Sequence, residues 1–168
     1  MKDANKQYVE EFGYRADLGG TASKNLAIVT CMDARVEPKK ALGLDVGEAN
    51  ILRNAGARVS DDVMRSLSVA TNLLDVDTIL VIHHTNCGME QRTTDEVIED
   101  ISGGDPVIRE AAEQVDWQPI ICEPDSLIED VAKLRGSPLI KDGTTVHGLL
   151  LDLETGEVTE VPETMERG

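Results

Sequence analysis

Two short apolar runs, rich in β-branched residues, constrain the fold of this chain more than any other feature. They span residues 26–30 (LAIVT) and 78–83 (TILVIH), and continuous apolar runs of this length are typical of strands buried on both faces of a parallel sheet. Between them, apolar residues recur at three and four positions over residues 61–74, which predicts an amphipathic helix capped by Asp61 or Ser60. A helix between two buried strands indicates a parallel α/β fold.

The remaining patterns predict how this unit is extended. A weaker strand candidate at residues 50–52 leads into a loop sequence over residues 53–57. Two further runs, residues 145–153 and 157–161, flank Glu154-Thr155-Gly156, which predicts a terminal β-hairpin. Helical spacing recurs in three later segments: 95–101, 107–115 and 124–135.

The segment 124–135 carries the clearest helix signals. Asp125 or Ser126 can cap its amino end, and Gly136 marks the point where it stops. A chain of 168 residues is within the usual size of one domain. We therefore expect a single α/β domain over residues 1–168, with a mainly parallel central sheet flanked by helices and an added C-terminal strand or hairpin.

The charge of the chain argues against two classes of partner. Its 32 acidic and 16 basic residues give a formal net charge of −16, and the resulting field repels phosphate backbones and anionic lipid. We therefore expect neither nucleic acid nor a membrane surface as a partner. No stretch approaches the roughly 18 consecutive apolar residues of a membrane span, and no run near the start resembles a signal peptide. These features favour a cytoplasmic protein.

The cysteines point to metal binding or catalysis. Their number is three and their spacing is wide, which argues against a disulfide framework. Cys31 directly follows the first apolar run, His84 directly follows the second, and Cys87 comes after two further residues in a tight turn. The carboxyl ends of parallel strands meet at one edge of a sheet, where α/β proteins bind ligands. We expect these three side chains to lie close together.

Zinc suits this set of side chains. It favours thiolate and imidazole, and catalytic zinc sites keep one coordination position open by using three protein ligands. Cys31, His84 and Cys87 would therefore bind one Zn²⁺ per chain and leave a position for water. His83 competes with His84, although strand alternation places the two on opposite faces. We interpret His83 as a polar residue hydrogen-bonded beneath the sheet, with a proton relay as its other possible role.

An aspartate and an arginine accompany the first cysteine. Asp33 and Arg35 share a face with Cys31 if residues 31–35 are extended. The guanidinium would keep the carboxylate ionised, so that it acts only as a hydrogen-bond acceptor beside the metal. Two alternatives stay open. The pair could merely fix the loop, or Asp33 could occupy the fourth zinc position and close the site until Arg35 draws it away.

The other cysteine and histidine outside this cluster are interpreted as structural. Cys122 lies in the apolar run Pro119-Ile120-Ile121-Cys122, and we expect it to be packed. His147 lies within the predicted hairpin, away from any second ligand.

Three segments together resemble the signature segments of the β-class carbonic anhydrases. They are residues 31–35 (CMDAR), 53–56 (RNAG) and 83–89 (HHTNCGM). The resemblance covers about residues 20–162, and the short prokaryotic members are the most similar. Three motifs in the same order are far more specific than any one of them. One departure is Asn86, where many members have Asp, which would change a contact behind the metal ligands without removing a ligand.

The resemblance implies a zinc enzyme that reversibly hydrates carbon dioxide to bicarbonate and a proton. It assigns metal binding to the same three residues and a catalytic dyad to Asp33 and Arg35. It also implies a homodimer or homotetramer, in which an N-terminal helical arm, residues 1–20, contacts a partner subunit. Two alternatives remain: a hydrolase of carbonyl sulfide or carbon disulfide, which shares the scaffold, and a non-catalytic zinc-binding module with a closed, four-ligand site.

Overall fold

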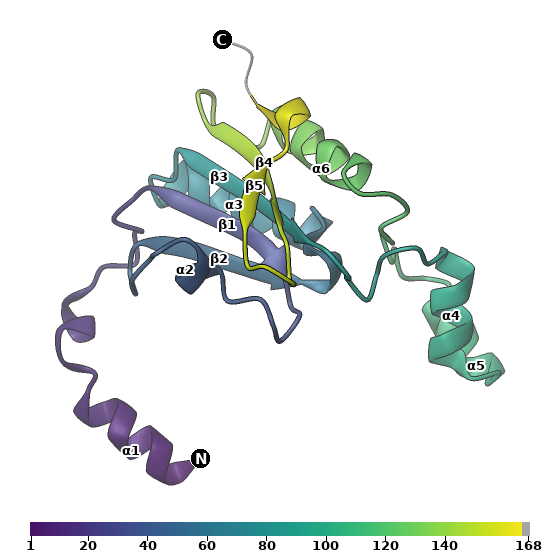
Figure 1. Cartoon of the computed structure of the whole chain (residues 1–168), viewed down its shortest axis with the longest axis horizontal. Coiled ribbons are helices and arrows are strands. Elements are labelled where there is room, and N and C mark those ends of the chain that lie inside the picture. The colour runs from purple at the N-terminus through teal and green to yellow at the C-terminus, as the bar shows by residue number, and fades with distance from the viewer. Residues whose placement is uncertain (166–168) are drawn as a thin grey trace.

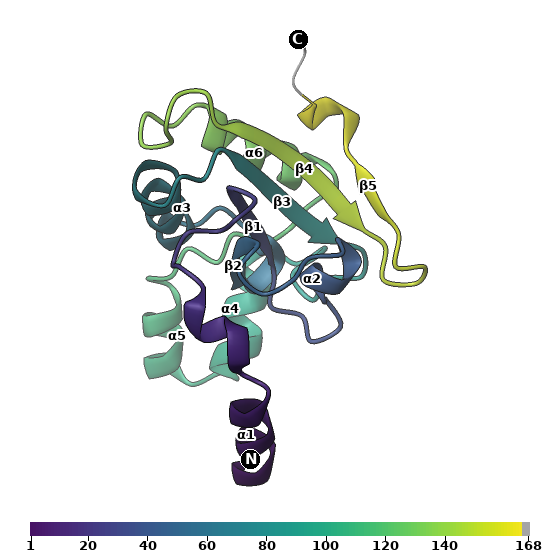
Figure 2. The ribbon, with the colours of Figure 1, turned by 90° about the vertical axis from the view of Figure 1, so that its left-hand side faces the viewer.

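The protein is built on one twisted, mostly parallel sheet. A computed structural model describes residues 1–165, and in it five strands lie in the order β2-β1-β3-β4-β5. Four are parallel, and the last is antiparallel to its neighbour at one edge of the sheet (Figures 1 and 2). Their bounds are β1 Leu26–Cys31, β2 Ala49–Asn54, β3 Thr78–His84, β4 Thr145–Leu151 and β5 Val158–Glu160. The expected α/β fold with a terminal hairpin is confirmed.

Helices connect and cover the strands. They are α1 Lys2–Glu10, α2 Pro38–Ala41, α3 Asp61–Leu73, α4 Thr94–Ser102, α5 Pro106–Ala112 and α6 Asp125–Arg135, with 3-10 turns at Gly13–Asp17, Ala55–Ala57 and Pro162–Thr164. Helices α3 and α6 pack on one face of the sheet, where Leu67 and Leu127 are fully buried. The other face has a second apolar cluster around Ile28, with Val36 and Leu42 from either side of α2. Apolar contacts on both faces thus hold the strand ends in place.

Helix α3 forms where the sequence predicts it. Ser60 is the N-cap, and its side chain accepts a hydrogen bond from the Val63 amide. Two aspartates in the first turn carry negative charge that interacts favourably with the positive end of the helix dipole. The buried residues Val63, Leu67 and Ala70 recur at helical spacing and face the sheet.

The predicted cap of α6 is wrong. The N-cap is Pro124, without a side-chain hydrogen bond, and Ser126 is already inside the helix and buried. The reason is that the preceding turn supplies the acceptor, since the Ser126 amide donates to the Cys122 carbonyl at 3.0 Å. The predicted end of this helix at Gly136 agrees with the structure.

Three further expectations need correction. Strand β2 continues through Asn54, because parallel pairing with β1 extends to the pair Cys31 and Asn54, so that part of the predicted loop is strand. Helix α5 ends at Ala112, three residues before the expected position. Cys122 is exposed rather than packed, as is Ile121 before it.

The N-terminal arm stands apart from the core. Helix α1 and the turn Gly13–Asp17 contain no buried residue, and both views show the arm projecting away from the sheet (Figures 1 and 2). Within residues 1–165, none of the helices has the length and apolar character needed to cross a bilayer.

Candidate metal centre

The three predicted ligands meet at the carboxyl edge of the sheet. Cys31 is the last residue of β1, His84 is the last residue of β3, and Cys87 lies in the turn that follows. One potential ligand atom from each lies within 4.8 Å of the others, and the two sulfur atoms are 3.9 Å apart. All three residues are buried, with 4%, 1% and 8% of their surfaces exposed. This group is the one potential metal cluster found within residues 1–165.

The hydrogen bonding of His84 prepares one ring nitrogen for a metal. Its Nδ1 lies 2.9 Å from the Thr85 carbonyl oxygen, which can only accept, so Nδ1 carries the proton. The lone pair is therefore on Nε2, a buried atom without a hydrogen-bond partner. A buried acceptor left without a partner is costly in a folded protein, whereas a metal-ligating histidine is held in this way by its other nitrogen.

The two thiols contact each other across 3.9 Å. A hydrogen bond from Cys87 lowers the pKa of Cys31, and the amides of Asp33 and Gly56 lower it further. The same contact with Cys31 raises the pKa of Cys87. Metals bind the thiolate form of cysteine, so a metal bound here would displace protons from the thiols. Two sulfur atoms and one imidazole nitrogen match the donor set of a zinc centre with three protein ligands.

The turn that carries Cys87 is fixed to neighbouring segments. Asn86 has a φ of +56°, a left-handed conformation that asparagine tolerates better than most residues. The Thr85 amide donates to the Leu151 carbonyl at 3.0 Å, and the Thr85 hydroxyl accepts from the Leu153 amide at 3.0 Å. Strand β4 thus anchors the turn. Asparagine at position 86 suits this left-handed backbone conformation and brings no charge to the turn.

Asp33 and Arg35 form a two-point ion pair. Arg35 donates from Nε to Oδ1 at 3.0 Å and from Nη2 to Oδ2 at 2.7 Å, and its backbone amide adds a bond to Oδ1. Hydrogen bonds from the Arg35 side chain hold the pKa of Asp33 well below its usual range, so the carboxylate stays ionised. Both of its oxygens face Arg35, and Asp33 is outside the group of converging ligand atoms. In this structure the carboxylate is therefore paired with Arg35, the arrangement expected of a dyad.

Two residues that shape the site had no side-chain role in the sequence analysis. Arg53 donates from Nε to the Cys31 carbonyl at 3.0 Å and from Nη2 to the Asp33 carbonyl at 2.8 Å, which fixes the loop after β1. Gly56 has a φ of +74°, and a Cβ atom there would lie 3.3 Å from Ile120 and 3.5 Å from Met89. The glycine therefore allows close approach of its backbone to Ile120 and Met89, which pack around the cysteines.

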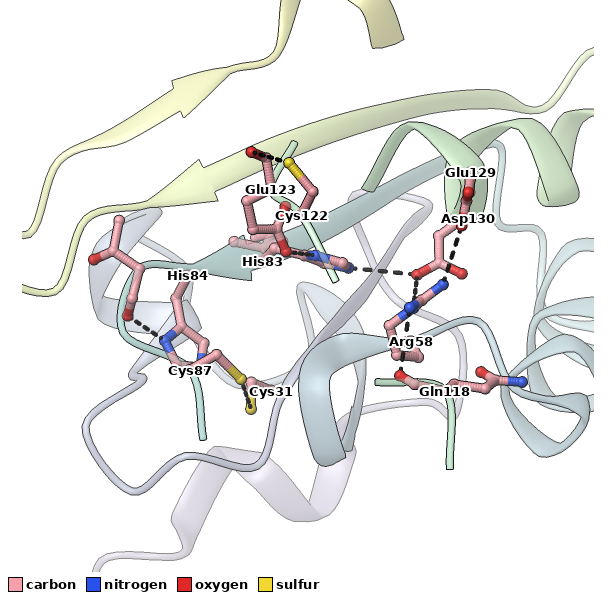
Figure 3. Close-up of polar contacts among 12 residues, drawn as sticks. Cys31, Arg58, His83, His84, Cys87, Gln118, Cys122, Glu123, Glu129 and Asp130 are labelled. Atoms are coloured by element: carbon pink, nitrogen blue, oxygen red, sulfur yellow. Dashed lines mark hydrogen bonds and ion pairs between the residues drawn. The ribbon is translucent and has the colours of Figure 1, made fainter. Parts of the chain in front are cut away.

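His83 points away from the three predicted ligands, as strand alternation predicts (Figure 3). It is buried, its Nδ1 lies 2.5 Å from Glu123, and its Nε2 lies 3.5 Å from Asp130. This agrees with the interpretation of a hydrogen-bonded residue under the sheet. His147 lies on β4, 3.7 Å from Glu160, outside the cluster.

Comparisons with known proteins decide the family. The family model described as carbonic anhydrase matches residues 26–158. Beta-carbonic anhydrase 1 of Mycobacterium tuberculosis is 37% identical over 156 residues, which cover 89% of this chain and 89% of that protein. The chain belongs to the β-carbonic anhydrase family. The resemblance seen in its three sequence motifs is confirmed.

Two further relatives show the breadth of this family. A crystal structure of a carbonic anhydrase from Streptococcus mutans has a TM-score of 0.86 and 42% identity, covering 95% of this chain and 93% of that one. A carbon disulfide hydrolase from Acidianus is 32% identical over 173 residues, covering 91% of this chain and 85% of that protein. The β-carbonic anhydrase scaffold therefore includes relatives named for a different substrate.

Cysteine variants test the metal centre. Cys31→Ser and Cys87→Ser each replace a soft thiolate by a hydroxyl, so we expect the purified variants to retain far less than one zinc per chain by elemental analysis. Cys122→Ser is the matched control, because Cys122 is exposed and outside the cluster. It should retain as much zinc as the unchanged protein. Equal zinc content in all three variants would contradict the assignment.

Proposed function

We propose that the protein catalyses the reversible hydration of carbon dioxide with one Zn²⁺ per chain, held by Cys31, His84 and Cys87. The observation that carries the proposal is the convergence of two buried thiols and a partnerless imidazole nitrogen within 4.8 Å. Membership of the β-carbonic anhydrase family supports the same activity. Three protein ligands leave a coordination position for a small molecule, which is the arrangement of catalytic zinc sites.

Bound zinc would supply a Lewis acid that lowers the pKa of a water molecule towards neutrality. The chain would supply the orientation. Asp33 has only acceptor oxygens when ionised, so it would accept a hydrogen bond from the attacking water and aim the oxygen lone pair at carbon dioxide. Arg35 keeps that carboxylate charged and at a fixed angle through its two-point contact. Arg53 fixes the backbone on which both residues stand.

The arm of the chain supports a proposed homodimer. Helix α1 has no buried residue, yet Tyr8 and Val9 lie on it with exposed side chains, and Tyr14 is exposed in the turn that follows. Apolar and aromatic residues on a projecting arm favour a surface that a second copy covers. A homodimer or homotetramer is the assembly that follows. The two buried thiols must remain reduced to bind metal, which supports a cytoplasmic location.

A sulfur-containing substrate is the second candidate. The similarity to the carbon disulfide hydrolase of Acidianus, over 91% of this chain, is the observation that favours it. A non-catalytic zinc module is less well supported, because both oxygens of Asp33, the nearest candidate for a fourth ligand, are bonded to Arg35.

Parallel assays of the zinc-loaded protein separate the substrates. Stopped-flow hydration of carbon dioxide should give a higher kcat/KM than hydrolysis of carbonyl sulfide or carbon disulfide under the same conditions. A protein with one zinc per chain that hydrolyses carbon disulfide but does not hydrate carbon dioxide would establish the second candidate instead.

The role of Asp33 is tested by Asp33→Asn. The amide keeps the size of the side chain but presents a donor where the charged acceptor stood, so we expect kcat/KM for carbon dioxide to fall by about 100-fold or more. Zinc content should be unchanged. Asp62→Asn is the control, because it disrupts another exposed aspartate-arginine pair, the one with Arg65. Unimpaired hydration by Asp33→Asn would show that Asp33 does not orient the reaction.

A further inference from the structure

A second carboxylate-arginine pair lies buried behind the metal centre. Asp130, on α6, is 2% exposed. Its Oδ2 accepts a hydrogen bond from Arg58 Nε at 2.7 Å and lies 3.5 Å from His83 Nε2. Its Oδ1 accepts from the Val59 amide at 3.1 Å. Figure 3 shows Asp130 between His83 and Arg58, on the side of His83 away from the two cysteines.

The first contact of Asp130 leads to the histidine ligand. His83 directly precedes His84 at the end of β3, and both of its ring nitrogens face carboxylates, Glu123 and Asp130. The hydrogen bond from Nδ1 to Glu123 and the Asp130 carboxylate beside Nε2 favour one orientation of the His83 ring at the end of β3. The next side chain, that of His84, then points to the opposite face, where the cysteines lie.

The second contact leads to the cysteine of β1. Arg58 and Val59, both bonded to Asp130, directly follow the turn Ala55–Ala57. Within that turn, Ala57 is fully buried and lies in one apolar cluster with Cys31. Fixing Arg58 and Val59 therefore fixes the end of the turn that packs against Cys31.

The third contact leads to the second cysteine. Arg58 Nη1 donates to the Pro119 carbonyl at 3.0 Å. The next residue, Ile120, donates its amide to the Met89 carbonyl at 3.0 Å and packs against both cysteines. Met89 closely follows Cys87 in the same turn. Through His83, Val59 and Arg58, Asp130 is therefore connected to all three segments that would present a metal ligand.

The physical properties of this pair suit a positioning role. The Arg58 and Asp130 side chains are only 11% and 3% exposed, so the pair is formed in a region of low dielectric, where the loss of one partner leaves a charge without compensation. Neither residue touches the ligand atoms. A buried charge held by several hydrogen bonds has one favourable position, and the groups hydrogen-bonded to it are therefore held in fixed positions as well.

We propose that Asp130 is a positioning residue of the metal centre, which acts through Arg58 and His83 to hold the three ligand-bearing segments in the geometry that binds zinc. The proposal rests on the proposed zinc function. It differs from a purely stabilising role, because it requires that the geometry and affinity of the metal site change when Asp130 is altered, even in protein that remains folded.

The test compares Asp130→Asn with Glu129→Gln. Both replace a carboxylate near Arg58 by an amide of the same shape and remove one negative charge, but Glu129 is exposed and lies 3.7 Å from Arg58. Zinc retention by the full-length holoprotein is measured against a competing chelator, and the cobalt-substituted protein is examined by its thiolate-to-metal absorption. We expect zinc affinity to fall about 10–100-fold in Asp130→Asn, with a shifted cobalt spectrum, and no change in Glu129→Gln.

The outcomes are separable. Folded Asp130→Asn with unchanged zinc affinity and cobalt spectrum would overturn the proposal, even if its melting temperature fell. An unchanged protein that binds no zinc would overturn the proposed function and this inference with it. If Asp130→Asn does not fold, Arg58→Lys replaces it, since lysine keeps the charge but loses the planar fork that joins Asp130 to Pro119. Unchanged zinc affinity in Arg58→Lys would then count against the proposal.

Discussion

The parallel pairing of β1 with β3 is the constraint on which the rest of this structure depends. The two strands are neighbours in register from Leu26 and Thr78 onward, so their carboxyl ends reach the same edge of the sheet and bring Cys31 and His84 together. A short turn then returns Cys87 to the same point. Apolar clusters on both faces of the sheet hold this arrangement, so the donor atoms are assembled by the fold.

Two aspartate-arginine pairs serve this edge in physically different ways. The Asp33–Arg35 pair is partly exposed and lies beside the proposed reacting molecules, where it sets the charge and direction of one acceptor. The Asp130–Arg58 pair is buried, and its bonds extend into the backbone behind each ligand. Water weakens the first pair, whereas burial makes the second costly to break. The Asp33–Arg35 pair is suited to a direct part in the proposed reaction, and the Asp130–Arg58 pair is suited to positioning the residues that would bind zinc.

Much of this site could be predicted from the sequence because its signals are local. Strand runs ending at Cys31 and His84 place two ligands at one edge, and alternation along β3 separates His84 from His83. The roles of Arg53, Arg58 and Asp130 could not be predicted, because their partners are distant in sequence: Asp130 bonds residues 71 and 72 positions away. The predicted cap of α6 was wrong for a different, local reason, since a backbone carbonyl in the preceding turn accepts the hydrogen bond expected of a side chain.

The most direct test of the central claim is X-ray absorption spectroscopy at the zinc edge on the zinc-loaded protein. Two cysteines and one histidine predict two sulfur neighbours at about 2.3 Å and two nitrogen or oxygen neighbours at about 2.0–2.2 Å, one of them an imidazole nitrogen. A shell of four sulfur atoms, or one with no sulfur at all, would contradict the site assembled at the ends of β1 and β3.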